Sequence, residues 1–350
     1  MKVITIGVWF CIGLMILSLL YSFIDTPLIF GAKVNSYLCK YNRILCLDNL
    51  PPLNPKCDPS TPYPHASSRD LVIGMFVPKK GWTEGHLEMI SFVFYLMRKT
   101  TPKVNLVMFL GDVLKNEEKW TKVMKTYNVT VEYVHVPEGW NMVNYRFVLY
   151  RDYLMKHTND YDRVIFCDSK DIYFLRDPFT QIGMNNTLLV GREFRSADPN
   201  DFYSYKGVYQ YYNNYIWMVQ SYGEQMAETL KNNNSVINNA GFGGGDIKSM
   251  IKLLSMWVDE MIRIKGQDRS GFDQSVYNYL IYSGKLTSEM NYTTFLDCSH
   301  YKICMFSEKR VALRNGIPYL SDGCVPHVLH RDGLSYNMLD IRRYPDNGLF

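Results

Sequence analysis

The sequence predicts an α/β protein whose main domain is a doubly wound, mostly parallel sheet. From residue 70 to residue 168, short continuous apolar runs alternate with helical patterns, which is typical of parallel strands covered by helices on both faces. The composition is that of a globular chain, with 47% hydrophobic and 21% charged residues among 350. It excludes a wholly disordered protein, and a net charge of +4 gives no reason to expect nucleic-acid binding.

Each element of this domain is predicted from its local pattern. Four apolar runs have the length of buried strands: Leu71–Val77, Val104–Leu110, Val129–Val136 and Arg163–Asp168. Three amphipathic stretches between them predict helices: Glu84–Lys99, Glu117–Tyr127 and Asn144–His157. Another helix is expected to begin near Ser270, and Asp246 is suited to cap a helix after the glycine-rich stretch Asn238–Gly245. Ligands of such sheets bind outside the carboxyl ends of the strands.

An uncharged apolar run at residues 3–23 precedes the domain. A helix of this length spans the roughly 30 Å hydrocarbon core of a bilayer, whereas the apolar part of a cleaved signal peptide is shorter. The run therefore predicts a transmembrane signal anchor, with a buried helix of a soluble protein as the alternative. Residues 1–2 would be a cytosolic tail, and Lys2 on that side indicates that the rest of the chain is lumenal.

Residues 24–69 have the composition of a stem, with six prolines between Asn49 and Pro64. Residues 70–350 are expected to form one domain of the size of a catalytic domain. Four glycosylation sequons follow the apolar run, at Asn128, Asn185, Asn233 and Asn291. Six cysteines outside the membrane run and the strands predict up to three disulfides: Cys39, Cys46, Cys57, Cys298, Cys304 and Cys324. These features predict a single-pass type II glycoprotein of the Golgi or ER membrane.

The clearest candidate site follows the fourth predicted strand. Asp168 and Asp171 lie three residues apart at its carboxyl end, where two carboxylates can converge on one hard cation. The alternative is that both are solvated turn residues.

The acidic pair, followed by a short apolar stretch and Asp177-Pro178-Phe179, resembles the metal motif of GT-A-fold nucleotide-sugar glycosyltransferases. Three later segments occur in the order found in retaining families of that fold, the glycogenin-like family and the plant cell-wall xylosyltransferases. They are Asn239-Ala240-Gly241, Asp273-Gln274 with Asn278, and Val328-Leu329-His330-Arg331-Asp332-Gly333. The resemblance covers roughly residues 70–335. It implies a GT-A-like fold and transfer of a sugar, with retention, from a UDP-sugar to a glycan or glycoprotein acceptor.

The resemblance also implies roles for single residues. The implied cofactor is Mn²⁺ or Mg²⁺, and its ligands are Asp168, Asp171 and His330. Carboxylates with imidazole suit Mn²⁺ better than Ca²⁺. His327 is the competing histidine, and a satisfied or solvated side chain is the alternative for His330. The implied catalytic residues are Asp273, Gln274 and Asn239. The implied donor-binding residues are Arg146, Asp168, Lys170, Asp171, Asn239, Ala240, Gly241, Arg331 and Gly333.

The chain departs from these families in two places. Its acidic motif is Asp-x-x-Asp instead of Asp-x-Asp, and Gly333 is followed by Leu-Ser-Tyr instead of Lys-Pro-Trp. Arg331 or Lys170 would therefore replace the lysine that contacts the donor diphosphate. The aromatic segment Phe202–Tyr222 is a candidate sugar-binding surface, or else a mixed core element. Two other functions stay open: an inverting transferase with Asp273 as general base, and a non-catalytic lumenal carbohydrate-binding or scaffold protein.

Overall fold

The structure, a computed structural model, describes residues 63–78, 81–183, 187–193, 212–290, 292–296, 298, 301–305, 311–314, 317–320 and 323–330. These residues divide into two compact units, of which the smaller holds residues 311–314, 317–320 and 323–324. The tail, the apolar run and all but residues 63–69 of the predicted stem lie outside the described residues. Within the described ranges, no helix is long and apolar enough to cross a membrane.

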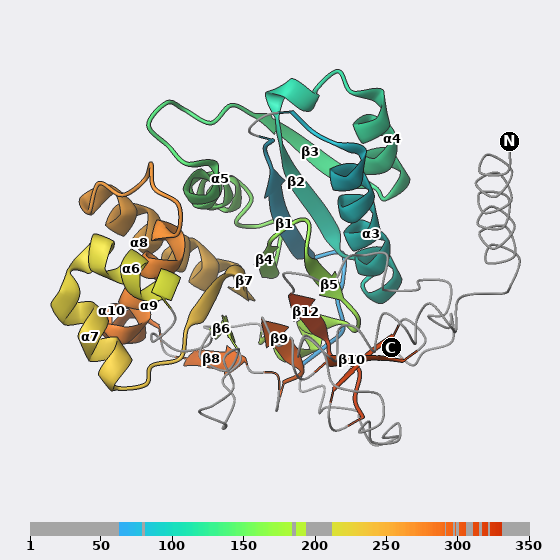
Figure 1. Cartoon of the computed structure of the whole chain (residues 1–350). Helices are drawn as coiled ribbons and strands as arrows, with labels where there is room; N and C mark the ends of the chain where they lie inside the picture. Colours follow the sequence, from blue (N-terminus) through green and yellow to red (C-terminus); the bar gives the residue numbers. More distant parts are fainter. Residues whose placement is uncertain are drawn as a thin grey trace, which may run out of the picture. The chain divides into compact units, whose positions relative to one another are not determined.

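A seven-stranded sheet with the order β3-β2-β1-β4-β7-β6-β8 forms the centre of the larger unit (Figure 1). Its strands are β1 (Asp70–Phe76), β2 (Asn105–Gly111), β3 (Val129–Val134), β4 (Arg163–Cys167), β6 (Thr187–Arg192), β7 (Asn238–Asp246) and β8 (Tyr292–Leu296). Six strands run in one direction, and β7 runs antiparallel to its neighbours β4 and β6. The mixed α/β class and the mostly parallel sheet are thus confirmed, and so are the four predicted strands, although β3 ends two residues earlier than expected.

Helices lie on both faces of the sheet, α3 and α4 on one and α5 and α8 on the other (Figure 1). The helices are α3 (Glu84–Thr100), α4 (Glu118–Thr126), α5 (Met142–Lys156), α6 (Tyr212–Tyr222), α7 (Glu224–Asn232), α8 (Ile247–Arg263), α9 (Phe272–Tyr282) and α10 (Lys285–Glu289), with 3₁₀ turns at Asp112–Leu114 and Pro178–Gln181. The predicted cap is confirmed, because the Asp246 carboxylate accepts hydrogen bonds from the backbone amides of Lys248 and Ser249 at the start of α8.

Aromatic side chains fill the core between the sheet and the helices α5, α8 and α9. The Phe147 ring stacks on Trp257 with a centroid distance of 4.0 Å, and Trp257 stacks on Tyr277 at 4.3 Å. All three side chains are fully buried. Because large aromatic side chains bury much apolar area, this stack holds α5 and α9 against the sheet in a fixed position. Both helices carry residues of the candidate site.

The glycine-rich stretch forms the central strand β7, and most of its glycines serve strand packing. A Cβ on Gly245 would lie 2.3 Å from the carbonyl oxygen of Thr187, and one on Gly243 would lie 2.6 Å from the Phe166 ring. These glycines let neighbouring backbones and rings approach closely. Only the start of this stretch lines a cavity, with Asn239, Ala240 and Gly241.

A second, three-stranded sheet has the order β5-β12-β9, with β5 at Ile172–Phe174, β12 at Val328–His330 and β9 at Ile303–Met305. Strands β10 (Val311–Arg314) and β11 (Ile317–Leu320) pair antiparallel in the smaller unit. Cys298 and Cys304 form a disulfide, Cys324 is also disulfide-bonded, and Cys167 is a buried free thiol. Cys39, Cys46 and Cys57 lie outside the described residues.

Candidate metal and donor site

Two short strands bring the three predicted metal ligands together. Asp168 follows β4 directly, and its backbone amide donates to the Gly241 carbonyl at 2.8 Å. Asp171 ends the turn that leads into β5. His330 ends β12, where it pairs with Ile172 of β5 in the antiparallel register. This register places the imidazole beside Asp171 although 159 positions separate the two residues in the chain.

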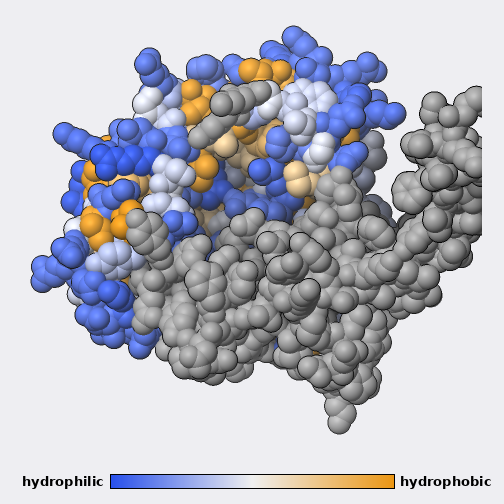
Figure 2. All heavy atoms as spheres, viewed as in Figure 1, coloured by the Kyte–Doolittle hydropathy of each residue, from blue (hydrophilic) through white to orange (hydrophobic). Residues whose placement is uncertain are grey.

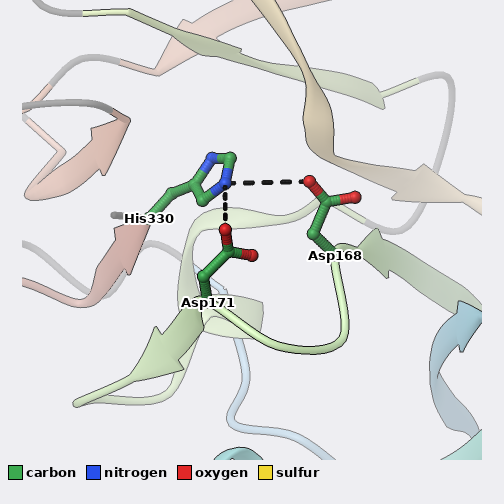
Figure 3. A group of neighbouring side chains, drawn as sticks. All are labelled: Asp168, Asp171 and His330. Atoms are coloured by element: carbon green, nitrogen blue, oxygen red, sulfur yellow. Dashed lines mark ion pairs between the residues drawn. The ribbon is translucent and has the colours of Figure 1, made fainter. Parts of the chain in front are cut away.

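Both carboxylates point toward the same ring nitrogen (Figure 3). His330 Nε2 lies 3.7 Å from Asp168 Oδ2 and 3.6 Å from Asp171 Oδ2. One ligand atom from each residue falls within 4.8 Å of the other two, so the three could hold a metal ion. The Asp168 and Asp171 side chains are 30% and 36% exposed, whereas the His330 side chain is 4% exposed. The carboxylates therefore remain accessible to a ligand, while the imidazole is held within the protein.

A glycine leaves room for this cluster. A Cβ on Gly241 would lie 2.5 Å from Asp168 Oδ2 and 2.9 Å from both Asn239 Oδ1 and His330 Cε1. Any larger residue would displace a candidate ligand atom. The space beside the cluster and its donor set of two carboxylates and one imidazole both fit a divalent cation such as Mn²⁺.

Arg146 on α5 joins the cluster to the neighbouring helix. Its Nη1 pairs with Asp168 Oδ1, and its Nη2 donates to Asp273 Oδ2 at 3.0 Å and to the Ala240 carbonyl at 3.1 Å. The guanidinium is a rigid fork with several donors, so these contacts fix Asp168 with one oxygen on Arg146 and the other toward His330. Arg146 is not a surface residue, because it is 8% exposed and lines the cavity.

Burial and nearby charge have opposing effects on the pKa values of His330, Asp171 and Asp273. Burial alone would lower the pKa of His330, but the carboxylates of Asp171 and Asp168 outweigh it and raise that pKa. Burial would raise the pKa of Asp171, yet His330, Lys170 and Arg146 together lower it. Burial raises the pKa of Asp273 despite the nearby charge of Arg146. The site is thus a compact set of opposite charges and not a group of free carboxylates.

A cavity of about 410 Å³ adjoins the cluster. Figure 2 shows this face of the molecule hollowed, with hydrophilic residues in the recess and hydrophobic patches beside it. Polar residues of the site line the cavity together with apolar residues at the end of β1 and at the start of α5: Met75, Phe76, Val77, Met142 and Val143. Mixed linings with a few convergent polar groups are typical of sites for small organic ligands.

The structure brings together most of the residues proposed from sequence. The cavity lining includes Arg146, Asp168, Lys170, Asp171, Asn239, Ala240, Gly241, Asp273, Gln274 and His330. Asn278 lies behind it, where its amide oxygen accepts from the backbone amide of Asn238 at 2.8 Å. His327 is not part of the metal cluster. Arg331, Gly333 and residues 202–211 of the aromatic segment lie outside the described residues, whereas Trp217 of the same segment lines the cavity.

Sequence reasoning missed Glu193, which is 6% exposed and follows β6. Its carboxylate accepts hydrogen bonds from Asn239 Nδ2 at 3.0 Å and from Gln274 Nε2 at 3.2 Å. The sequence signal is unlike that of Asp168, because Gly191 and Arg192 separate the apolar run Leu188–Val190 from Glu193. No protein-family model matches the chain, and no curated protein is significantly similar to it.

Proposed function

We propose that this protein is a metal-dependent glycosyltransferase with a GT-A-like fold, which moves a sugar from a UDP-sugar to a glycan or glycoprotein acceptor. The observation that carries the proposal is the convergence of Asp168, Asp171 and His330 beside a cavity of about 410 Å³ that Arg146 also lines. A nucleotide-sugar combines a diphosphate, which needs neutralising charge, with hydroxyl groups, which need amide partners. The cavity offers both kinds of group at its wall.

Mn²⁺, or Mg²⁺, is the proposed cofactor, and Asp168, Asp171 and His330 would hold it. When bound, the ion supplies a Lewis acid beside the leaving diphosphate. Arg146 keeps Asp168 Oδ2 turned toward the cluster by pairing with the other oxygen. Lys170 lines the same cavity and would contact a phosphate, as would Arg331 and Gly333 by resemblance. Asn239, Ala240 and Gln274 would bind the donor sugar.

We propose retention of the sugar configuration over the inverting alternative. The inverting mechanism needs a carboxylate free to take the acceptor proton, and Asp273 was the candidate base. Asp273 is instead 5% exposed, and Arg146 donates to its Oδ2 at 3.0 Å. This geometry suits a residue that positions Arg146, so the departing diphosphate is the proposed acceptor of that proton.

The proposed location is the lumen of the Golgi or ER, with residues 3–23 as a type II membrane anchor and residues 24–69 as a stem. The uncharged apolar run and the sequons after it support this orientation. The proposed partners are the nucleotide-sugar, the acceptor glycan or glycoprotein, and the membrane.

The variants Asp168→Asn and Asp171→Asn test the proposed activity. Each keeps the size of the side chain but removes one anionic ligand, so we expect transfer from UDP-sugars to fall about 10²-fold or more. Release of UDP from a panel of UDP-sugars, with Mn²⁺ and with chelator, measures the effect. Chelator should reduce the parent protein to the level of the variants.

Asp152→Asn is the matched control, because Asp152 lies on the exposed side of α5 and pairs with the adjacent Arg151. It should turn over like the parent. Near-parental turnover in both site variants would contradict the assignment. A parent protein that binds glycans but releases no UDP from any donor would instead favour the carbohydrate-binding or scaffold alternative.

A further inference from the structure

Glu193 is a buried glutamate that contacts two polar residues of the cavity lining, Asn239 and Gln274. Glu193 and Glu260 are each 6% exposed. Glu260 pairs with the cations Arg263 and Lys285, and Glu193 Oε1 accepts hydrogen bonds from two side-chain amides. The Glu193 backbone is fixed on two sides, by a parallel bridge to Met305 and by a hydrogen bond of 2.9 Å to the Ile237 carbonyl. With its backbone held in this way, Glu193 can fix the orientation of the Asn239 and Gln274 side-chain amides that donate to it.

The carboxylate determines which way two amides turn, because it can only accept hydrogen bonds. Asn239 must direct its Nδ2 toward Glu193, and its Oδ1 accepts from the Gly241 amide at 2.8 Å. Gln274 must direct its Nε2 toward Glu193 as well, and its Oε1 accepts from the Ala240 amide at 3.2 Å. Both amide groups line the cavity, so their orientation decides what a ligand meets there.

Gln274 can still accept a hydrogen bond from a ligand, but it has no N–H hydrogen left to donate. An amide NH₂ carries two hydrogens, and Gln274 Nε2 donates one to Glu193 and the other to Asn214 Oδ1 at 2.7 Å. What Gln274 can still offer a ligand is a lone pair on Oε1. Asn239 keeps one free N–H hydrogen and one lone pair. A ligand that satisfies this wall must present a hydrogen-bond donor to Gln274.

We propose that Glu193 is a positioning residue that makes Gln274 an obligate acceptor for one hydroxyl group of the donor sugar. The inference rests on the proposed function and adds the residue that sets its specificity. A site built to bond a hydroxyl strongly rejects an analogue without it, because its own polar group is then left unpaired. The enzyme therefore discriminates against the donor that lacks this hydroxyl, and the discrimination depends on Glu193.

Glu193→Gln tests the proposal. The variant keeps the shape of the side chain at position 193 but replaces a carboxylate, which can only accept hydrogen bonds, with an amide that can also donate. The probes are UDP with Mn²⁺, the best donor from the UDP-sugar panel, and the deoxy forms of that donor at each hydroxyl. We expect kcat/KM for the full donor to fall at least tenfold. The ratio of kcat/KM for the full donor to kcat/KM for one of the deoxy donors should fall by a similar factor. The Kd of UDP with Mn²⁺ should change by much less than this factor, because Glu193 is not one of the three candidate ligands, although its charge also acts on His330.

Glu260→Gln is the matched control for loss of a buried carboxylate, and it should lower stability but keep the deoxy preference. An unchanged preference in Glu193→Gln would overturn the proposal. So would a joint loss of UDP binding, stability and turnover, which indicates a purely structural role. A parent protein that neither binds UDP nor uses any donor would overturn the proposed function itself, an outcome distinct from both.

Discussion

The two oxygens of Asp168 have separate partners, and this division explains how the site tolerates its density of charge. Oδ1 pairs with Arg146, and Oδ2 faces His330 across 3.7 Å. Arg146 thus offsets part of the repulsion between Asp168 and the other carboxylates without occupying the oxygen that faces the cluster. A lysine at position 146 would have one point of charge instead of a fork and could not hold Asp168, Asp273 and the Ala240 carbonyl in the same way.

Gly241→Ala is predicted to impair the cluster through shape alone. Its Cβ would approach Asp168 Oδ2 to 2.5 Å and His330 Cε1 to 2.9 Å, so at least one ligand must move away. We expect Mn²⁺ affinity, measured by titration calorimetry with UDP present, to fall tenfold or more. The free energy of unfolding should fall by only about 1–3 kcal/mol, as in other overpacked sites.

Gly74→Ala is the control for that change, because Gly74 also lies in a buried strand near the site. Its Cβ would meet the Cys167 carbonyl and the Met108 sulfur at 3.4 Å, which the neighbours can accommodate. It should keep parental Mn²⁺ affinity. Parental affinity in Gly241→Ala would show that the cluster does not bind the ion in the inferred way.

Helices and strands that depend on a local sequence pattern can be predicted from the sequence, whereas strands that depend on pairing with a distant segment cannot. The strands β1–β4 and the helices α3–α5 follow from apolar runs and amphipathic periods of adequate length. Strands β5, β9 and β12 have only three residues each, and their pairing joins segments far apart in the chain. No local pattern determines such a register.

The same distinction applies to the candidate site. Asp168 and Asp171 could be found because they end a strand within one short motif, whereas the place of His330 depended on resemblance until the β5–β12 register explained it. Glu193 and Asn214 could not be found in this way, because their roles depend on side-chain contacts with Gln274, 81 and 60 positions away. The orientation of an amide is a property of the packed structure.

The cap of α8 stabilises the helix and also contacts the neighbouring strand β6. Asp246 is 4% exposed and accepts from the amides of Lys248 and Ser249 and from the Thr187 amide at 2.7 Å, so it joins the helix to β6. Asp246→Ala leaves these donors buried without an acceptor. Urea unfolding should show a loss of about 2–4 kcal/mol.

Asp246→Asn is the comparison, since its amide oxygen can still accept at the cap, and it should lose less stability than the alanine variant. In both variants the folded protein should keep parental Mn²⁺ affinity, because Asp246 does not line the cavity. A loss of affinity as large as that of Gly241→Ala would contradict a purely structural role for this residue.

Tertiary contacts give two histidines that are close together in the chain pKa shifts in opposite directions. His330 faces two carboxylates, which raise its pKa against the effect of burial. His327 is 3% exposed, and burial lowers its pKa to about 4, with further lowering by the charges of Arg176 and Lys302 and a smaller opposing effect of the Asp177 backbone. The polar surroundings of each ring decide which of them can serve as part of a charged site.

The buried neutral His327 predicts a pH dependence of folding. Its pKa of about 4 in the folded state is below the value of about 6.5 in an unfolded chain, so the unfolded state binds more protons between these values. The contribution of His327 is complete above about pH 6.5 and is lost as the pH falls toward 4, by about 3 kcal/mol at most. His327→Gln should remove this part of the slope when the free energy of unfolding is measured by urea titration from pH 7 to pH 4. His135→Gln is the comparison for loss of an imidazole at the surface. Equal slopes in the parent and in His327→Gln would show that the imidazole reaches solvent, or a carboxylate, when it is protonated.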